Sequence, residues 1–402
     1  MTSSGPGADL EATLRGVVEP LAPLVRRAGS PGEQRAAQML AEAFEGAGAP
    51  ARIDEVPFRD GYARLLLPLA LAGLLVGLGS RNGRRRPGRA MVAAGAAAAL
   101  VDDVENRSRV WRRAVARPRT TWNVVAQAGD ASAERTLVVL AHHDAAPTGR
   151  VFDPGLQRWF AKRFPELVQR TNTSMPLWWA AAAGPGLAAL GAATGSRRLS
   201  RAAAGLSAVN LALGADIARN RIVPGANDNL SGVAALVALA RRLRDEPPAG
   251  LRVLLASCGA EEVLQGGIYG FVERTLRPLD PGSTWVLNLD TIGSPELLML
   301  EGEGPFWMHD YTDPSFRDLL ADVARRATGA PLARGARARA STDSVIPSRA
   351  GYPTATLVSW EPDTKLQSNY HLPSDVPENV CYGTVAAAVT IAEALARELA
   401  SG

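Results

Sequence analysis

Uninterrupted apolar runs separated by helical patterns are the feature that most restricts how this chain can fold. Such runs lie at 135–141 (RTLVVLA), 251–257 (LRVLLAS) and 354–360 (TATLVSW), and amphipathic helical patterns lie between them at 231–245 and 313–329. Strands that are apolar on both faces are typical of a parallel sheet covered by helices on both sides. The sequence therefore predicts an α/β fold with a mostly parallel central sheet.

The N-terminal 58 residues add two predicted helices and a strand. Ser30 is the predicted N-cap of the second helix, with Pro31 at its first position and Glu33 completing a capping box. The alternating stretch 51–58 reads as a strand, and the C-terminal stretch 384–399 reads as a helix. The core can be large, because a chain of 402 residues is long enough for one big domain or two smaller ones.

Composition excludes several classes of function. The formal net charge of +4 is small for this length, and no aromatic-plus-basic motif is present, so we expect no nucleic-acid partner. The two cysteines, Cys258 and Cys381, do not make a disulfide framework. The first 30 residues contain acidic groups and no apolar core segment, which predicts no cleavable signal peptide.

Two segments, 59–118 and 150–222, interrupt the alternating pattern. Each contains two apolar stretches joined by an arginine-rich loop, which predicts inserted hydrophobic helical hairpins at 62–101 and 175–218. One interpretation is that they associate with a membrane, since a span needs roughly 17–25 apolar residues. The other is a helical cap whose apolar faces pack on each other. The first predicts a membrane-associated protein and the second is compatible with a cytoplasmic one.

Polar side chains gather at the ends of the predicted strands. His142 and Asp144 follow the first run, and Glu261 and Glu262 follow the second. In an open α/β sheet, ligands bind at the carboxyl ends of the strands. The other polar positions of this kind are Asp228 in GANDNLSG (225–232), Asp290 after the run 283–290, and Tyr370 and His371 in NYHLPSD (369–375).

Several carboxylates crowded at one sheet edge repel one another unless a cation lies among them. Imidazoles mixed with carboxylates favour zinc or a similar transition ion over calcium or magnesium. Taken singly each motif is weak, because acidic turns, helix caps and surface histidines are common. Their order and their positions at strand ends together indicate a metal site.

With these motifs in this order, the chain resembles metallopeptidase family 28, the co-catalytic zinc exopeptidases that include bacterial aminopeptidases. The family pattern is His-x-Asp, Asp-Asn with Ser-Gly, Glu-Glu, Asn-x-Asp, and Tyr-His. The resemblance covers 30–58 and 119–400 and implies a zinc exopeptidase fold, related to phosphorylase/hydrolase-like folds, over a single domain, 1–402. The inserted segments 59–118 and 150–222 lie outside it.

The resemblance implies two Zn²⁺ ions about 3.5–4 Å apart, in a site that Co²⁺ or Mn²⁺ can also occupy. Asp228 would bridge the ions, His142 and Asp290 would complete one, and Glu262 and His371 the other, with the two pairs open to exchange. Asp144 would orient His142. Glu261 would be the general base for a metal-bridging water, and Tyr370 would donate to the oxyanion. A cis peptide bond between Asp228 and Asn229 is also implied.

The predicted function is therefore a di-zinc aminopeptidase that acts on peptides with a free N-terminus. Alternatives are a glutaminyl-cyclase-like acyltransferase with one zinc, a non-catalytic membrane scaffold of the same fold, and a related carboxypeptidase or amidohydrolase. One departure from the family stands out. In typical members His-x-Asp and Asp-Asn lie close together in sequence, whereas here the segment 150–222 separates His142 from Asp228. We expect the base of this insertion to lie beside the metals.

Overall fold

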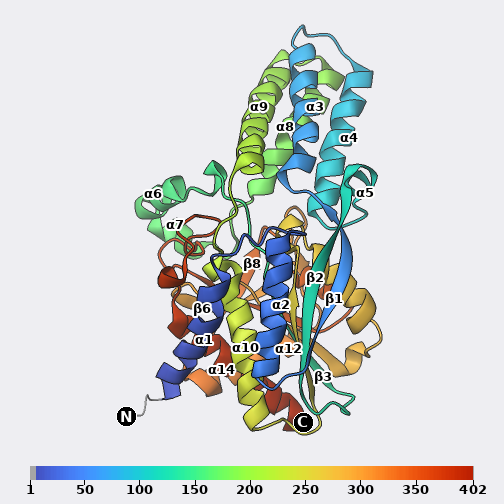
Figure 1. Ribbon diagram of the computed structural model, residues 1–402. Coiled ribbons are helices and arrows are strands. Elements are labelled where there is room, and N and C mark those ends of the chain that lie inside the picture. The colour runs from blue at the N-terminus through green and yellow to red at the C-terminus, as the bar shows by residue number, and fades with distance from the viewer. Residues whose placement is uncertain (1–5, 402) are drawn as a thin grey trace.

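One sheet organises the molecule, which a computed structural model describes for residues 6–401 (Figure 1). Within that range the strand order is β1-β2-β4-β3-β5-β9-β6-β7, and β8 pairs with β6. The central strands β4, β3, β5 and β9 are parallel, as predicted. The strands on either side pair antiparallel, except that β8 runs parallel to β6. The strands are β1 (Ala51–Asp60), β2 (Arg117–Gly129), β3 (Thr136–His142), β4 (Arg252–Cys258), β5 (Thr284–Leu289), β6 (Glu296–Glu303), β7 (His309–Asp310), β8 (Ala333–Ala338) and β9 (Thr354–Trp360).

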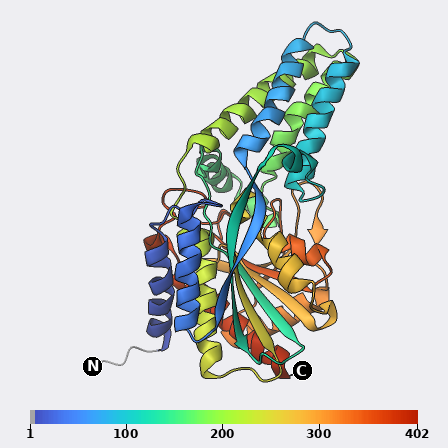
Figure 2. The same ribbon diagram turned by 45° about the vertical axis from the view of Figure 1, so that its right-hand side comes forward.

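Helices cover both faces of the sheet, which explains why the central strands are apolar throughout. Every residue of β3 is buried. One face packs against the larger core cluster, which includes residues of α1 (Pro6–Leu21), α2 (Pro31–Gly46), α10 (Ser231–Asp245), α12 (Pro314–Thr328) and α14 (Tyr382–Ser401). The other face packs against α11 (Gly266–Phe271) and α13 (Val345–Arg349). Figure 2 shows α1, α2 and α10 side by side on one side of the sheet.

Strands β6, β7 and β8 are not among the predicted strands. The short apolar run of β6 ends in Glu-Gly-Glu, and β8 (ARGARA) contains arginine and glycine at positions where a buried strand would be apolar. β8 becomes a strand because it pairs with β6, whose opposite edge pairs with β9. This pairing is a tertiary effect that local sequence propensity does not report.

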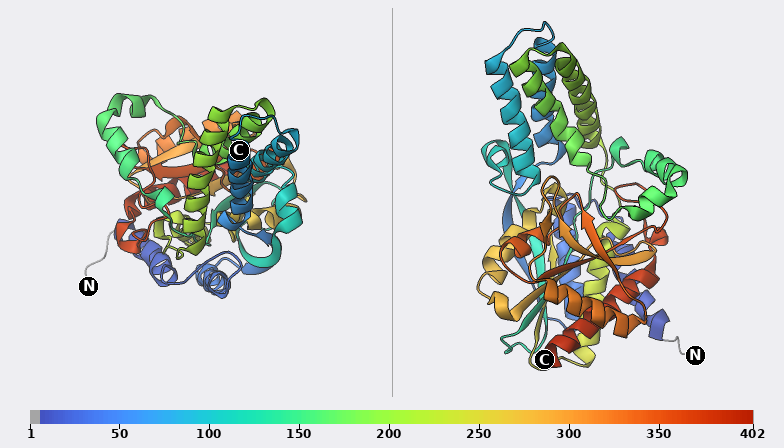
Figure 3. Two further views of the ribbon diagram at one scale, coloured as in Figure 1. Left: turned by 90° about the horizontal axis from the view of Figure 1, so that it is seen from above. Right: turned by 180° about the vertical axis from the view of Figure 1, so that it is seen from behind.

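The two apolar insertions form helices that stand above one end of the sheet (Figure 1). The first gives α3 (Ala63–Gly79) and α4 (Pro87–Val104), followed by the short α5 (Val110–Val115). The second gives α6 (Gly155–Arg163) and α7 (Pro165–Arg170), then α8 (Leu177–Thr194) and α9 (Arg197–Arg219). Helices α3, α4, α8 and α9 pack together as a bundle, and α6 and α7 lie beside its base (Figure 3).

Small residues let the helices of the bundle approach closely. A Cβ atom added at Gly77 of α3 would lie 2.9 Å from the backbone nitrogen of Ala204 in α9. A Cβ at Gly184 of α8 would lie 2.6 Å from Ser207 Oγ of α9. The apolar faces of the two insertions therefore pack on each other, with Val76, Ala188 and related side chains in a shared core.

The prediction that these hairpins span a membrane is wrong for residues 6–401, where no helix combines the length and the apolar composition that crossing a bilayer requires. Helix α3 has 17 residues with Pro68 inside it, and α9 begins with two arginines and contains Asn210 and Asp216. Contact of the bundle with a lipid surface, and the division of the chain into one domain with two insertions, stay predictions from the sequence.

Two mid-helix glycines test the close packing of the bundle. Gly77→Ala should lower the free energy of unfolding by about 1 kcal/mol or more, because the new methyl group overpacks the α3–α9 contact. Gly95→Ala in α4 is the matched control: nothing lies within 4 Å of its Cβ position. It should raise the same free energy by about 0.5–1 kcal/mol through helix propensity. Denaturant titration of both variants measures the difference, and equal shifts would contradict this packing.

Candidate metal centre

Three parallel strands end side by side and carry the candidate residues to one place. In the parallel register His142 of β3 lies beside Cys258 of β4. A 3₁₀ turn, Glu261–Val263, follows β4, and Asp290 follows directly after β5. The sheet edge therefore collects side chains from segments far apart in sequence, as the strand pattern predicts.

Asp228 lies between two histidines. Its Oδ1 is 3.3 Å from His142 Nε2, and its Oδ2 is 3.3 Å from His371 Nε2. Gly225 shapes the turn before it: its φ of 59° is left-handed, and an added Cβ would lie 2.5 Å from the Asp228 carbonyl oxygen. The peptide bond between Asp228 and Asn229 is cis, as the resemblance implies. Each carboxylate oxygen thus faces a different imidazole.

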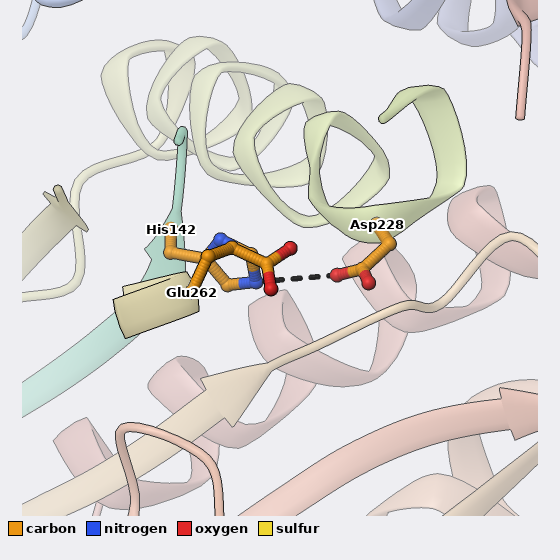
Figure 4. A group of neighbouring side chains, drawn as sticks. All are labelled: His142, Asp228 and Glu262. Carbon is orange, nitrogen blue, oxygen red and sulfur yellow. Dashed lines mark ion pairs between the residues drawn. The ribbon is translucent and has the colours of Figure 1, made fainter. Parts of the chain in front are cut away.

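Glu262 completes a compact group of donors. One ligand atom from each of His142, Asp228 and Glu262 lies within 4.8 Å of the others, and all three residues are buried. Glu262 Oε2 is also 3.2 Å from His371 Nε2. Figure 4 shows His142 at the end of β3 and Glu262 in the turn after β4 close together, with Asp228 opposite them just before α10.

Asp144 fastens two parts of the site together. Its Oδ1 accepts a hydrogen bond from the Glu261 backbone N–H at 2.9 Å, and its Oδ2 accepts one from the Glu262 N–H at 3.1 Å. Oδ1 is also 3.5 Å from His142 Nδ1, the ring nitrogen that faces away from Asp228. This fully buried carboxylate therefore fixes the turn that bears both glutamates relative to the imidazole.

Glu261 occupies the same cavity but has a different partner. Its Oε1 accepts a hydrogen bond from Gln265 Nε2 at 2.7 Å, and the same amide donates to the Ser341 carbonyl. Burial raises the pKa of Glu261 well above its ordinary value, although the neighbouring His142 opposes this shift. The side chain is thus held in one orientation without taking part in the compact donor group.

Asp290 and Tyr370 also line the cavity. Asp290 Oδ1 accepts from Thr291 Oγ1 at 2.9 Å, and that hydroxyl lies 3.3 Å from Asp228 Oδ1. The Tyr370 ring stacks on His371, with 3.9 Å between ring centroids. Asp290 lies outside the compact donor group and reaches it through Thr291. Seven of the eight predicted side chains line one cavity, and the eighth, Asp144, is buried behind the turn that bears the two glutamates.

Opposite charges shape the protonation of the site. Burial alone would lower the pKa of His371, but Glu262 and Asp228 outweigh it and raise that pKa to about 10. The pKa of His142 is also raised, because Asp144 and Asp228 outweigh burial. Burial would raise the pKa of Asp228, but the two imidazoles outweigh it and lower that pKa.

The donor set fits a divalent ion. Among residues 6–401, His371 Nε2 has no hydrogen-bond partner although two carboxylate oxygens lie within 3.3 Å, and Glu262 Oε1 has none either. Buried polar atoms of this kind cost free energy unless something pairs with them. Imidazole nitrogen and carboxylate oxygen are ordinary zinc ligands. A cation among these atoms would satisfy them and offset the repulsion between Asp228 and Glu262.

Supporting residues that the motifs did not single out hold the Asp228 loop. Asp375 accepts from the Asn227 and Asp228 backbone N–H groups at 2.7 and 3.1 Å. Buried Arg26 donates to the carbonyls of His143 and Pro224, both at 2.8 Å. Asp375 belongs to the quoted stretch NYHLPSD, so its place in a motif was the available signal. No signal in the sequence pointed to Arg26, because arginine is abundant in this chain.

The remaining histidines lie apart from the donor group. His143 is fully buried, its Nδ1 is 2.9 Å from Ser257 Oγ, and burial lowers its pKa to about 4. His309 Nε2, in β7, lies 3.0 Å from Ser348 Oγ. Asp343 is also buried, and burial raises its pKa to about 8. The pair His142–His143 therefore divides between the site and the core.

A cavity of about 830 Å³ opens onto the donor group. Its walls come from both insertions as well as from the sheet edge: Tyr62 precedes α3, Phe152 precedes α6, and Trp178 begins α8. Phe152 packs against His371, with 4.4 Å between ring centroids. The second insertion thus lies beside the candidate metal ligands, as its position in the sequence predicts.

Solved structures of known proteins share this fold. An aminopeptidase from Aneurinibacillus sp. strain AM-1 superposes with a TM-score of 0.55 at 14% identity over 96% of this chain and 92% of its own. A leucine aminopeptidase precursor from Bacteroides thetaiotaomicron gives 0.55 at 12% identity over 99% and 98%. A glutaminyl cyclase from the same organism, bound to N-acetylhistamine, gives 0.55 at 12% identity over 97% of both chains. These likenesses confirm the predicted α/β fold.

A search of curated protein sequences finds no match. Residues 211–396, however, match the model of peptidase family M28. The matched part contains Asp228, the two glutamates, Asp290 and the Tyr370–His371 pair. His142 and Asp144 precede it in the sequence, before helices α8 and α9. The resemblance carried by the motifs is therefore confirmed over residues 211–396, which are similar to a family of peptidases.

Proposed function

We propose that this protein is a di-zinc aminopeptidase that removes N-terminal residues from peptides. The observation that carries the proposal is the Asp228 carboxylate, which presents one oxygen to His142 and the other to His371, each at 3.3 Å. A carboxylate placed between two separate imidazoles is the arrangement that a bridging ligand of a two-metal site needs. The family match supports a peptidase as the type of enzyme.

The proposed ligands divide between two ions. His142 and Asp290 would hold one, His371 and Glu262 the other, with Asp228 shared. The contacts of His371 with Glu262 and of His142 with Asp228 support this division. When bound, zinc supplies Lewis acidity, which polarises a scissile carbonyl and lowers the pKa of water.

Glu261 is the proposed general base. It lines the cavity beside the donor group and is oriented by Gln265 rather than by a histidine. It would take a proton from the attacking water and return it to the leaving amine. The Tyr370 hydroxyl would donate a hydrogen bond to the oxyanion, since its ring is fixed against His371. Asp144 would act only through the side chains that it positions.

Two other activities can be distinguished from an aminopeptidase by the substrates that they require. The glutaminyl cyclase among the solved structures shares the fold to the same degree, so cyclisation of peptides with N-terminal glutamine is the second candidate. The hydrolase is favoured because the site contains five side chains suited to metal binding and also Glu261, the proposed general base. Peptides with a free or an acetylated amino end distinguish an aminopeptidase from a carboxypeptidase.

Glu261→Gln should lower kcat for a free-amine peptide by about 10²–10⁴-fold, because the amide cannot accept the proton. Metal content should not change, since Glu261 is not a proposed ligand. Glu273→Gln is the control: this exposed residue pairs with Arg277 on the surface and should leave kcat unchanged. An unchanged kcat in Glu261→Gln would rule out its role, and cyclisation faster than hydrolysis would favour the cyclase.

Elemental analysis should find about two zinc ions per chain. Asp228→Asn should lose both, because the bridge serves both ions. Asp144→Asn should keep the fold and weaken zinc binding by about 10–100-fold, as loss of an orienting partner typically does. One ion in the unaltered protein after zinc is resupplied would contradict the bridged site.

Zinc affinity should fall as pH falls. The metal-free pKa of His371 is about 10 and that of His142 is raised, so both imidazoles carry protons that the ion must displace at neutral pH. Affinity should therefore drop by about tenfold per pH unit for each histidine that is deprotonated on binding. Competition with a chelator between pH 6.5 and 8.5 measures the slope. In His371→Gln one proton fewer should be displaced when zinc binds, so the slope of affinity against pH should be shallower. An unchanged slope would argue against His371 as a ligand.

A further inference from the structure

Residues 169–174, which we call the strap, run along one side of the cavity, and Thr171, Thr173 and Ser174 line it. The Arg337 backbone N–H donates to the Asn172 carbonyl at 2.8 Å, and the Ser174 N–H donates to the Arg337 carbonyl at 3.3 Å. Lys365 Nζ donates to the carbonyls of Gln169 and Thr171 at 2.9 and 2.6 Å. The strap is thus tied to β8 and to the loop after β9, both of which line the cavity.

The walls beside the strap are mostly apolar. Phe152, Leu156, Phe160 and Met175 from the second insertion face the cavity together with Trp178. A cavity of about 830 Å³ falls within the roughly 300–1,000 Å³ that encloses a small ligand. An apolar cavity of this size, which we call the chamber, suits a short peptide with apolar side chains and holds only part of a long chain.

Two cations in this chamber have no acidic partner. Arg158 pairs with Glu361 at 3.2 Å and Arg337 with Asp310 at 2.8 Å. Arg339 and Lys365 also line the cavity, but among residues 6–401 neither forms an ion pair. Arg339 lies over the Trp179 ring, and Lys365 bonds only backbone carbonyls. Cations flanked by apolar walls attract an anionic ligand, because the low local dielectric strengthens the interaction.

We propose that the substrates are short apolar peptides whose free C-terminal carboxylate binds Arg339 and Lys365 while the N-terminal residue lies at the metal site. This inference rests on the proposed function, since it places the scissile bond at the donor group. The carboxylates around the metals are acidic and those two side chains are basic, so the chamber matches the charges of a peptide at its two ends. The second insertion would then set peptide length as well as polarity.

The test compares Leu-Leu-Leu with its C-terminal amide, both with a free amino end. The acid should have a kcat/KM about tenfold higher, as expected for one charge-assisted contact. Arg339→Gln should remove the preference. Arg170→Gln is the matched control: this arginine belongs to the strap, but its side chain is 81% exposed and does not line the cavity, so the preference should persist. A nine-residue peptide with the same N-terminus should be cleaved more slowly than the tripeptide.

Calorimetry on zinc-loaded Glu261→Gln separates binding from catalysis. Tighter binding of the acid than of the amide supports the carboxylate subsite even if the unaltered enzyme cleaves neither, an outcome that would overturn the proposed activity alone. Equal binding of acid and amide would overturn the subsite even if both are hydrolysed. If Arg339→Gln folds poorly in thermal unfolding, Lys365→Gln provides the second variant, and a preference that survives in whichever variant folds overturns the assignment of these cations.

Discussion

The buried carboxylate of Asp144 is the contact on which the site depends. It lies one residue beyond His143, after the end of β3, and accepts both backbone N–H groups of the Glu-Glu turn that follows β4. Strand pairing fixes His142 beside Cys258, but it does not fix the turn three residues later. Asp144 supplies that constraint while facing His142 Nδ1 at 3.5 Å. One buried side chain therefore sets an imidazole, a proposed metal carboxylate and a proposed base in relation to one another.

Burying so many charges requires compensation from the surroundings. Burial raises the pKa of Glu33 to about 8, and hydrogen bonds from Gly29, Thr121 and Ala260 partly oppose it. Burial likewise raises the pKa of Asp375 to about 7, against the two N–H groups of the Asp228 loop. Burial lowers the pKa of Arg26 to about 10, and the neighbouring Asp375 and Asp144 partly oppose this shift. The site thus contains many buried ionisable groups that hold one another in place through hydrogen bonds and opposite charges. Cations at the centre would complete this arrangement.

The sequence could predict the chemistry because strand ends and motifs are local features. Asp228 and Asp290 follow from short patterns and from the rule that parallel strands share one carboxyl edge. Glu33 shows the limit of local reasoning. Ser30 caps α2 as predicted, but the predicted capping box is not formed, because the Ser30 N–H donates to the Arg27 carbonyl. The Glu33 side chain instead accepts from the Gly29 N–H, the Thr121 hydroxyl and the Ala260 N–H. The strap contacts of Lys365 and the β6–β8 pairing join segments whose proximity no local pattern reports.

The division between sheet and insertions explains how one site can combine fixed chemistry with a particular substrate. Every proposed catalytic or metal-binding side chain comes from the sheet edge or from loops packed on it, where Asp144, Asp375 and Arg26 restrict movement. Part of the chamber wall comes from the insertions, which contribute none of these groups. Phe152 is where the two meet, because it packs on His371 and faces the chamber. A change in the insertions can therefore alter which peptide fits while the metal site keeps its geometry. The long separation in sequence between His142 and Asp228 follows from this arrangement, because the segment that forms part of the chamber wall is inserted between these two proposed metal ligands.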